Sequence, residues 1–181
     1  MIINLKGSNT LVVGGSRGIG AAVVRTAAQA GSDAAWTFSG SEKGKNASEE
    51  LVDSLNTCPG DLRYDAVDCT DETATRDLVN TLVSAWGSLD RLVVNAGFTS
   101  SVSFSDLTLE EGEKLISINL TSAFIASHSV IPHMKKRGGG AIVFIGSAAV
   151  VSGGQAVPLR RLGKPEDIAN LAVFLLSDKA S

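Results

Sequence analysis

The stretch that most constrains this chain is Leu11–Gly20, with the sequence LVVGGSRGIG. An apolar run stops at glycines, and a helical pattern begins directly after them, which predicts a strand, a tight turn and a helix start. A helix start exposes unpaired backbone N–H groups and the positive end of the peptide dipoles. The turn is therefore suited to hold a phosphate group, although an ordinary turn between a strand and a helix has the same parts.

Three glycines have separate tasks in this turn. We expect Gly14 to adopt the positive φ that a tight turn needs, and Gly18 to let the backbone approach a diphosphate. Gly20 lets the helix pack close to the strand. The spacing GxxxGxG differs from the commoner GxGxxG, so the pattern alone is weak support for a nucleotide site. The other residues of the turn that we consider for binding are Ser16, Arg17 and Ile19.

The composition argues against several other classes of protein. The chain has 181 residues and a net charge of −3, without a basic run long enough for a nucleic-acid footprint. The cations at 135–137 are better explained by the end of a helix, where they offset the peptide dipoles. No apolar run approaches the roughly 20 residues of a membrane span, and residues 1–4 do not form a signal peptide. We therefore expect neither a nucleic-acid partner nor a membrane.

The cysteines and histidines do not point to a metal site. Cys58 and Cys69 lack the spacing of metal ligands, and we expect free thiols in a reducing compartment, the cytoplasm by default. His128 and His133 lie five residues apart on a predicted helix, which is the wrong spacing to share one face.

Strands and helices alternate at least five times along the chain. Strands are predicted at 10–13, 34–38, 62–67, 89–94 and 141–145, and helices at 19–29, from 46, at 71–86 and at 108–137. This alternation is typical of an α/β fold with a parallel sheet covered on both faces, a Rossmann-like, doubly wound α/β/α sandwich. Ligands of such sheets bind at the carboxyl ends of the strands.

Several motifs in the expected order resemble the classical short-chain dehydrogenase/reductase family, in particular its 3-oxoacyl reductases. They are the glycine turn, Asp68 after the third strand, the triplet 95–97 after the fourth, Asn119 on the long helix and Ser147 after the fifth strand, followed by the segment 158–169. The resemblance implies a nicotinamide dinucleotide held by Gly14, Ser16, Arg17, Gly18, Ile19, Gly20, Asp68, Cys69, Asn95, Ala96 and Gly97.

The end of the second strand bears on the choice of cofactor. NAD-binding proteins usually place an acidic residue there, against the ribose hydroxyls. Here Phe38 is followed by Ser39, Gly40 and Ser41, and no carboxylate is present to repel a phosphate. Arg17 can pair with a 2′-phosphate, and the two serines can add hydrogen bonds, so we expect NADP(H) rather than NAD(H).

The resemblance also implies an activity. Family members transfer a hydride between the nicotinamide and a carbonyl or alcohol carbon, with a serine that binds the substrate oxygen and an asparagine in a proton relay. Ser147 and Asn119 match these two catalytic positions. The resemblance further implies a homodimer or homotetramer assembled through the long helices.

The match fails at the tyrosine and lysine that complete the family's catalytic group. Tyr64 is the single tyrosine of the chain, and no lysine follows it by four residues. Between Ser152 and Ala156 the chain lacks the catalytic helix and the next strand, about 50–60 residues at ordinary element lengths. A final strand after Ser181 is also missing from the single domain 1–181. We favour the explanation that the whole protein has these residues and that the sequence shown lacks them. The alternative is a true deletion, and it would indicate a nucleotide-binding regulator without turnover.

Overall fold

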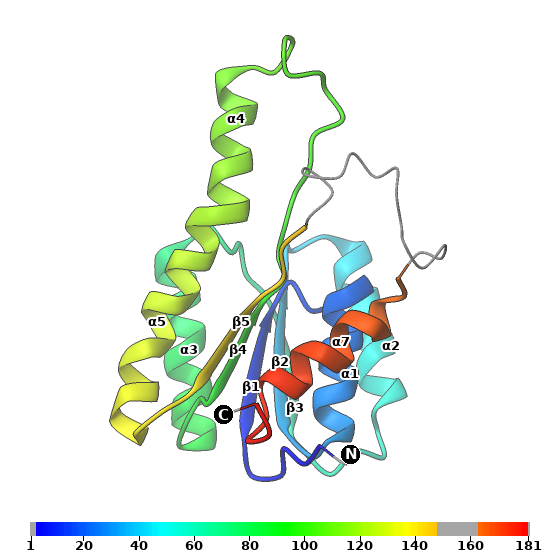
Figure 1. Cartoon of the computed structure of the whole chain (residues 1–181), viewed down its shortest axis with the longest axis vertical. Coiled ribbons are helices and arrows are strands. Elements are labelled where there is room, and N and C mark those ends of the chain that lie inside the picture. Colours follow the sequence, from blue (N-terminus) through cyan, green and yellow to red (C-terminus); the bar gives the residue numbers. More distant parts are fainter. Residues whose placement is uncertain (1–2, 148–162, 181) are drawn as a thin grey trace.

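The computed structural model describes residues 3–147 and 163–180, and it contains a parallel sheet of five strands (Figure 1). The strands are β1 (Asn9–Val13), β2 (Asp33–Phe38), β3 (Leu62–Ala66), β4 (Arg91–Val94) and β5 (Ala141–Phe144), in the spatial order β3-β2-β1-β4-β5. All four pairings are parallel. The order reverses direction at β1, so the predicted doubly wound α/β fold is confirmed, and the carboxyl ends of β1 and β4 lie side by side.

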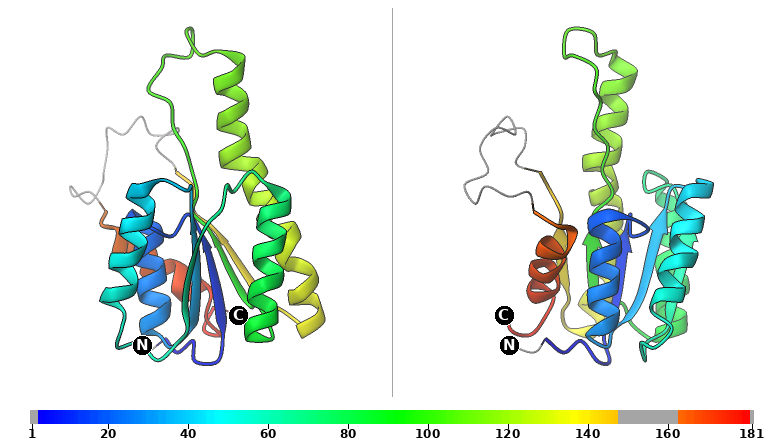
Figure 2. Two further views of the ribbon diagram at one scale, coloured as in Figure 1. Left: turned by 180° about the vertical axis from the view of Figure 1, so that it is seen from behind. Right: turned by 90° about the vertical axis from the view of Figure 1, so that its right-hand side faces the viewer.

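Helices cover both faces of this sheet (Figure 2). On one face lie α1 (Gly18–Gln29), α2 (Glu42–Ser54) and α7 (Pro165–Leu175); on the other lie α3 (Glu72–Trp86) and α5 (Ser122–Arg137). The side chains of each strand alternate between the two layers. Val12 packs with α1 and α7, whereas its neighbours Leu11 and Val13 pack with α3 and α5. The strands are therefore apolar on both sides, as parallel strands covered by helices must be.

Local signals set most helix ends. The carboxylate of Asp71 accepts a hydrogen bond from the Ala74 N–H at 2.9 Å and caps α3, and Gly87 ends that helix with φ 80°. Both features follow from the sequence. The expected loop at 39–44 is wrong in part: α2 begins at Glu42 rather than near Asn46, because the Ser41 hydroxyl accepts a hydrogen bond from Gly44 N–H and caps the helix early.

The longest helical stretch rises beyond the carboxyl edge of the sheet (Figure 1). It consists of α4 (Leu109–Ile116), one wide turn η1 (Ser117–Thr121) with π-helical hydrogen bonds, and α5. The stretch Leu109–Arg137 has 29 residues, and one window of it reaches a mean hydropathy of 1.3. The expectation that no stretch approaches a membrane span therefore fails by length and composition alone, because polar but uncharged residues interrupt the apolar ones without lowering the mean hydropathy enough. The inner side chains of the stretch, Ile125, Ala126, Val130 and Met134, are buried.

Candidate cofactor site

A cavity of about 580 Å³ opens at the carboxyl ends of the strands, where the order of the sheet reverses. This is the position at which open α/β sheets bind ligands. The residues that line it come from the β1–α1 turn and from the ends of β2, β3 and β4, together with one residue of η1. The predicted site residues among them are Gly14, Ser16, Arg17, Gly18, Ser39, Asp68, Cys69, Asn95, Ala96 and Gly97.

The β1–α1 turn has the backbone geometry expected of a phosphate-binding turn. Gly14 has φ 80°, which confirms the predicted positive φ. A Cβ atom on Gly20 would lie 2.2 Å from the Gly14 carbonyl oxygen, so the helix and the turn pack as closely as predicted. Gly20 is buried beneath the turn, and Ile19 packs against the core, so neither residue lines the cavity.

The start of α1 is free to receive an anion from the cavity. Arg17 is its N-cap residue, no side chain caps the helix, and its first turn contains no acidic residue. Gly18 has open space around its α-carbon. The amide dipoles of the first turn are therefore directed at the cavity without a competing carboxylate.

Two side chains hold the turn in place from neighbouring strands. Asn95 Nδ2 donates to the Gly14 carbonyl oxygen at 2.7 Å, and the Asn95 and Ala96 N–H groups both donate to the Val13 carbonyl oxygen. From β2, the Thr37 hydroxyl oxygen accepts the Gly14 N–H at 3.1 Å. The turn is thus fixed by β2 and β4 before any ligand binds, and such preorganisation lowers the entropic cost of binding.

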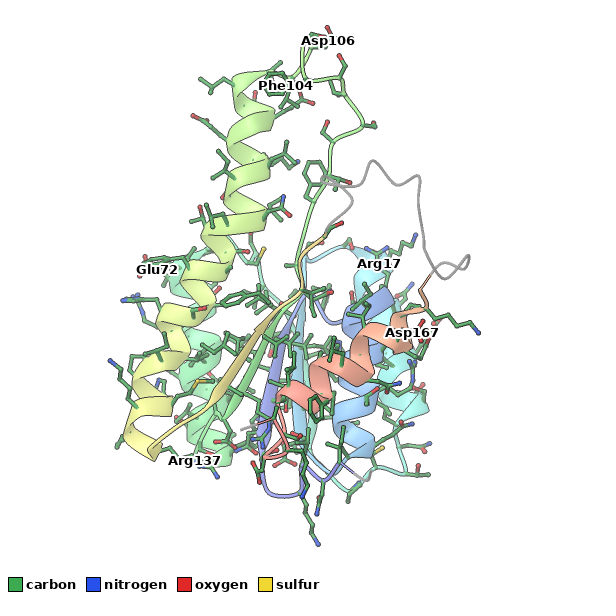
Figure 3. The ribbon with its side chains drawn as sticks, viewed as in Figure 1. Arg17, Glu72, Phe104, Asp106, Arg137 and Asp167 are labelled. Atoms are coloured by element: carbon green, nitrogen blue, oxygen red, sulfur yellow. The ribbon has the colours of Figure 1, made fainter. Side chains whose placement is uncertain are left out.

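The two serines after β2 have different environments. Ser39 is exposed and lines the cavity together with Arg17, whereas Ser41 does not line it and caps α2 instead. Figure 3 shows Arg17 beside the upper end of α1, at the level of the strand ends. Arg17 and Ser39 are therefore the exposed polar residues on the part of the cavity next to β2, where the buried Thr37 also lines the wall.

Asp68 and Cys69 line the cavity beyond the end of β3. The Asp68 carboxylate accepts hydrogen bonds from the N–H group and the hydroxyl of Thr70, at 2.9 and 2.7 Å. These bonds lower the pKa of Asp68 below its ordinary value, so the side chain is ionised at neutral pH. Burial raises the pKa of the Cys69 thiol, and the charge of Asp68 adds to this effect, so the thiol stays protonated.

Asn119 lies in the wide turn η1 and ties the long helix to the loop after β4. Its Nδ2 donates to the Phe98 carbonyl oxygen at 2.8 Å and to the Leu115 carbonyl oxygen at 2.9 Å, while its Oδ1 accepts the Phe98 N–H at 3.1 Å. The extra residue of a π-type turn is frequent at functional sites. Here it accompanies an asparagine whose side chain fixes Phe98, a residue of the cavity wall.

The remaining predicted groups lie outside this cavity. Ser147 is exposed three residues beyond β5 and is not among the residues that line the cavity. Tyr64 lies in β3, where its ring stacks on Trp36 with centroids 5.7 Å apart, so it packs against the core and does not line the cavity. The predicted join between Ser152 and Ala156 falls outside the described residues.

Sequence reasoning missed five residues of the cavity wall. They are Thr37, Phe38, Val67, Phe98 and Ile118. Four of them lie at or just after the carboxyl ends of β2, β3 and β4, and the rule that ligands bind at strand ends was the signal that could have identified them. No sequence signal identifies Ile118, because its place at the wall depends on how the long helix crosses the sheet.

The comparisons with known proteins agree with this geometry. The model of the short chain dehydrogenase family matches residues 8–159. The 3-oxoacyl-(acyl-carrier-protein) reductase FabG of Chlamydia pneumoniae is 27% identical over 237 aligned residues that include 100% of this chain and 94% of the reductase.

Two solved structures with bound nicotinamide cofactors have the same fold. A 7α-hydroxysteroid dehydrogenase complexed with NADH and 7-oxo glycochenodeoxycholic acid has a TM-score of 0.85 at 25% identity, covering 99% of this chain and 91% of that one. A blue fluorescent protein from a metagenomic library, in complex with NADPH, has a TM-score of 0.86 at 25% identity, covering 98% and 93%. The family match over most of the sequence and the cavity at the strand reversal lead to one conclusion: the chain belongs to the short chain dehydrogenase family.

Proposed function

We propose that this protein binds NADP(H) and is an oxidoreductase that acts on a carbonyl or alcohol substrate. The observation that carries the proposal is the uncapped start of α1, which faces a cavity of about 580 Å³ with Arg17 at its rim. The volume lies within the range of ordinary small-molecule sites. When bound, the nicotinamide supplies the hydride that is exchanged with the substrate carbon.

The described residues fit the parts of such a dinucleotide. The free amides at the start of α1 and the open face of Gly18 suit the diphosphate. The ionised Asp68 is a hydrogen-bond acceptor for the adenine amino group at the β3 side of the cavity. The segment Asn95–Gly97 forms the wall next to β4, on the nicotinamide side.

The preference for NADP(H) over NAD(H) rests on charge. Among the described residues that line the cavity, Asp68 is the single acid, and it follows β3 rather than β2. The part next to β2 presents Arg17 and Ser39, with no carboxylate to hold ribose hydroxyls or to repel a phosphate. A guanidinium is well suited to bind the dianionic 2′-phosphate.

We further infer that Ser147 hydrogen-bonds the substrate oxygen. Asn119 positions the loop after β4 relative to the long helix, through its hydrogen bonds to Phe98 and Leu115. The catalytic tyrosine and lysine are assigned to residues absent from the given sequence. The alignment with the reductase supports this assignment, because it spans 237 positions while the chain has 181 residues.

The cytoplasm is the proposed location, since both cysteines are free thiols.

Removing the charge of Arg17 tests the cofactor assignment. We expect Arg17→Gln to weaken NADPH binding by about 10- to 100-fold, the size of a lost charge-assisted hydrogen bond. NADH has no 2′-phosphate, so its affinity should change less than about threefold. Fluorescence titration measures both affinities, with Arg25→Gln, on the same helix but away from the cavity, as the matched control.

An equal loss for both cofactors would contradict the role of Arg17, and no binding of either cofactor to the folded protein would overturn the proposed function. Oxidation of NADPH by the protein as encoded, followed at the absorbance of the reduced nicotinamide against a panel of ketones and 3-oxoacyl thioesters, tests turnover. Absence of activity across that panel would count against the oxidoreductase.

We also propose that two copies associate through the outer face of the long helix. This face has an exposed apolar stripe at helical spacing, formed by Ile116, Leu120, Phe124 and Ile131. Residues 115–134 contain no Asp, Glu, Lys or Arg. Three acidic residues and Lys114 precede this segment, and three basic residues follow it, so an antiparallel pair of helices would bring together ends of opposite net charge. These residues are Glu110, Glu111 and Glu113, and Lys135, Lys136 and Arg137.

A buried charge at the centre of the stripe should separate the copies. Phe124 is 67% exposed in the single chain, and Phe124→Glu is expected to give a monomer, because an unpaired carboxylate in an apolar contact is costly. Phe104→Glu is the control, since Phe104 lies at the tip of the loop before α4 (Figure 3) and outside the stripe. Sedimentation velocity measures the mass; a wild-type monomer at micromolar concentration would contradict the proposal.

A further inference from the structure

The wall of the cavity next to β4 carries a cation that none of the proposed steps uses. Phe98 lines the cavity and is 38% exposed, and the Nζ atom of Lys114 lies 5.1 Å from the centroid of its ring. Lys114 belongs to α4, the part of the long helix that rises past the strand ends. A cation over an aromatic face is held there by the quadrupole of the ring. The ammonium is thereby placed beside the cavity.

The backbone of Phe98 is held in place by hydrogen bonds from the long helical stretch. The amide and carbonyl of Phe98 are both bound by the side chain of Asn119, five residues after Lys114 on the same helical stretch. These hydrogen bonds hold the backbone of Phe98 next to the helical stretch that carries Lys114. This arrangement sets Lys114 apart from an ordinary surface lysine.

The charge of Lys114 is available to a ligand. Among the described residues, no carboxylate forms an ion pair with it, although Glu110 and Glu111 lie within one helical turn. The Glu111 carboxylate accepts the N–H and hydroxyl groups of Thr108 in the capping box at the start of α4, which directs it away.

Lys114 and Arg17, the cation proposed to bind the cofactor, lie beside different parts of the cavity because of the order of the strands. Arg17 and Ser39 belong to the part of the cavity next to β2, whereas Phe98 follows β4, and β1 lies between these two strands. A dinucleotide with its adenosine next to β2 and its nicotinamide next to β4 leaves Lys114 on the substrate side. One ammonium above one exposed aromatic ring matches a ligand with an apolar segment and a single negative charge.

We infer that Lys114 is a specificity-determining residue that selects carbonyl substrates carrying a carboxylate. The apolar chain of such a substrate packs on Phe98, and its carboxylate pairs with the Lys114 ammonium. This inference rests on the proposed function, because it assigns the substrate class of the same site. It requires no catalytic step, so binding alone tests it.

The test measures the affinity of short-chain oxocarboxylates for the NADPH-saturated protein, each compared with its neutral methyl ester, through the change in NADPH fluorescence. We expect the wild-type protein to bind the acids more tightly than the esters by about fivefold, the upper range of an exposed ion pair. Lys114→Gln should abolish this difference and leave ester affinity unchanged. Lys6→Gln, at the opposite edge of the sheet, is the matched control and should preserve it.

Salt gives a second readout. At about 1 M salt the Debye length falls to about 3 Å, so the preference for the acids should vanish in the wild-type protein. Equal affinities for acid and ester in the wild-type protein, or equal losses for both in Lys114→Gln, would overturn the inference. Failure of NADPH itself to bind would instead overturn the proposed function, and the first step of the titration shows which of the two has failed.

Discussion

Replacing Gly20 by alanine is expected to lower the affinity for NADPH by about 100-fold. A Cβ atom at this position would lie 2.2 Å from the Gly14 carbonyl oxygen and 2.7 Å from Asn95 Nδ2. These two atoms form the 2.7 Å hydrogen bond that joins the turn to the β4 loop, so the new methyl group must break that bond or displace α1. Overpacking of this kind costs about 1–3 kcal/mol, and the cost falls on binding because the displaced turn must return to its original position to hold the diphosphate; its upper end corresponds to about a hundredfold in affinity.

A second glycine supplies the control for this prediction. Gly112 lies inside α4 with nothing within 4 Å of an added Cβ, and its φ is not positive. Gly112→Ala should therefore leave NADPH binding unchanged and stabilise the protein by up to about 1 kcal/mol through helix propensity. Calorimetric titration and thermal unfolding of both variants separate loss of the site from loss of the fold. If Gly20→Ala bound NADPH within threefold of the wild type, the turn would not hold the diphosphate.

The features of the fold and of the site that the sequence predicted are those determined by neighbouring residues along the chain. The positive φ of Gly14, the cap formed by Asp71 and the helix end at Gly87 each depend on a few consecutive residues. The alternation of strands and helices also predicted the layers and the edge of the sheet at which the cavity opens. These signals are local because steric and capping preferences act within one turn of the backbone.

Two kinds of feature could not be predicted: side chains that can serve either of two purposes, and contacts between distant segments. Ser41 is of the first kind, because a serine at that position can bind a ligand or cap a helix, and its hydroxyl caps α2. The contact between Asn119 and Phe98 spans 21 residues and depends on the wide turn η1, which no residue type predicts. The cation over Phe98 follows from the same contact, so it too is visible only in three dimensions.

Asp90, at the opposite edge of the sheet, also makes contacts between distant segments that the sequence does not predict. Its replacement has the largest expected effect on stability. Its side chain is 5% exposed and forms an ion pair with Arg137 at the end of α5. One carboxylate oxygen also accepts the Asn9 N–H at 2.9 Å, and its backbone carbonyl accepts the Ala141 N–H. Asp90 thus joins the starts of β1, β4 and β5 to the long helix.

Asp90→Ala is expected to lower the free energy of unfolding by about 3 kcal/mol, because it removes the buried carboxylate that pairs with the half-exposed Arg137 and leaves the buried Asn9 N–H without an acceptor. For a chain of this size the melting temperature should fall by about 6–12 °C. Glu72→Ala is the control: it removes an exposed pair with Arg76 at 3.5 Å, four residues along α3, and should cost less than about 0.5 kcal/mol. Chemical denaturation measures both changes. Equal effects of the two variants would show that the contact between Asp90 and Arg137 does not secure the amino edge of the sheet.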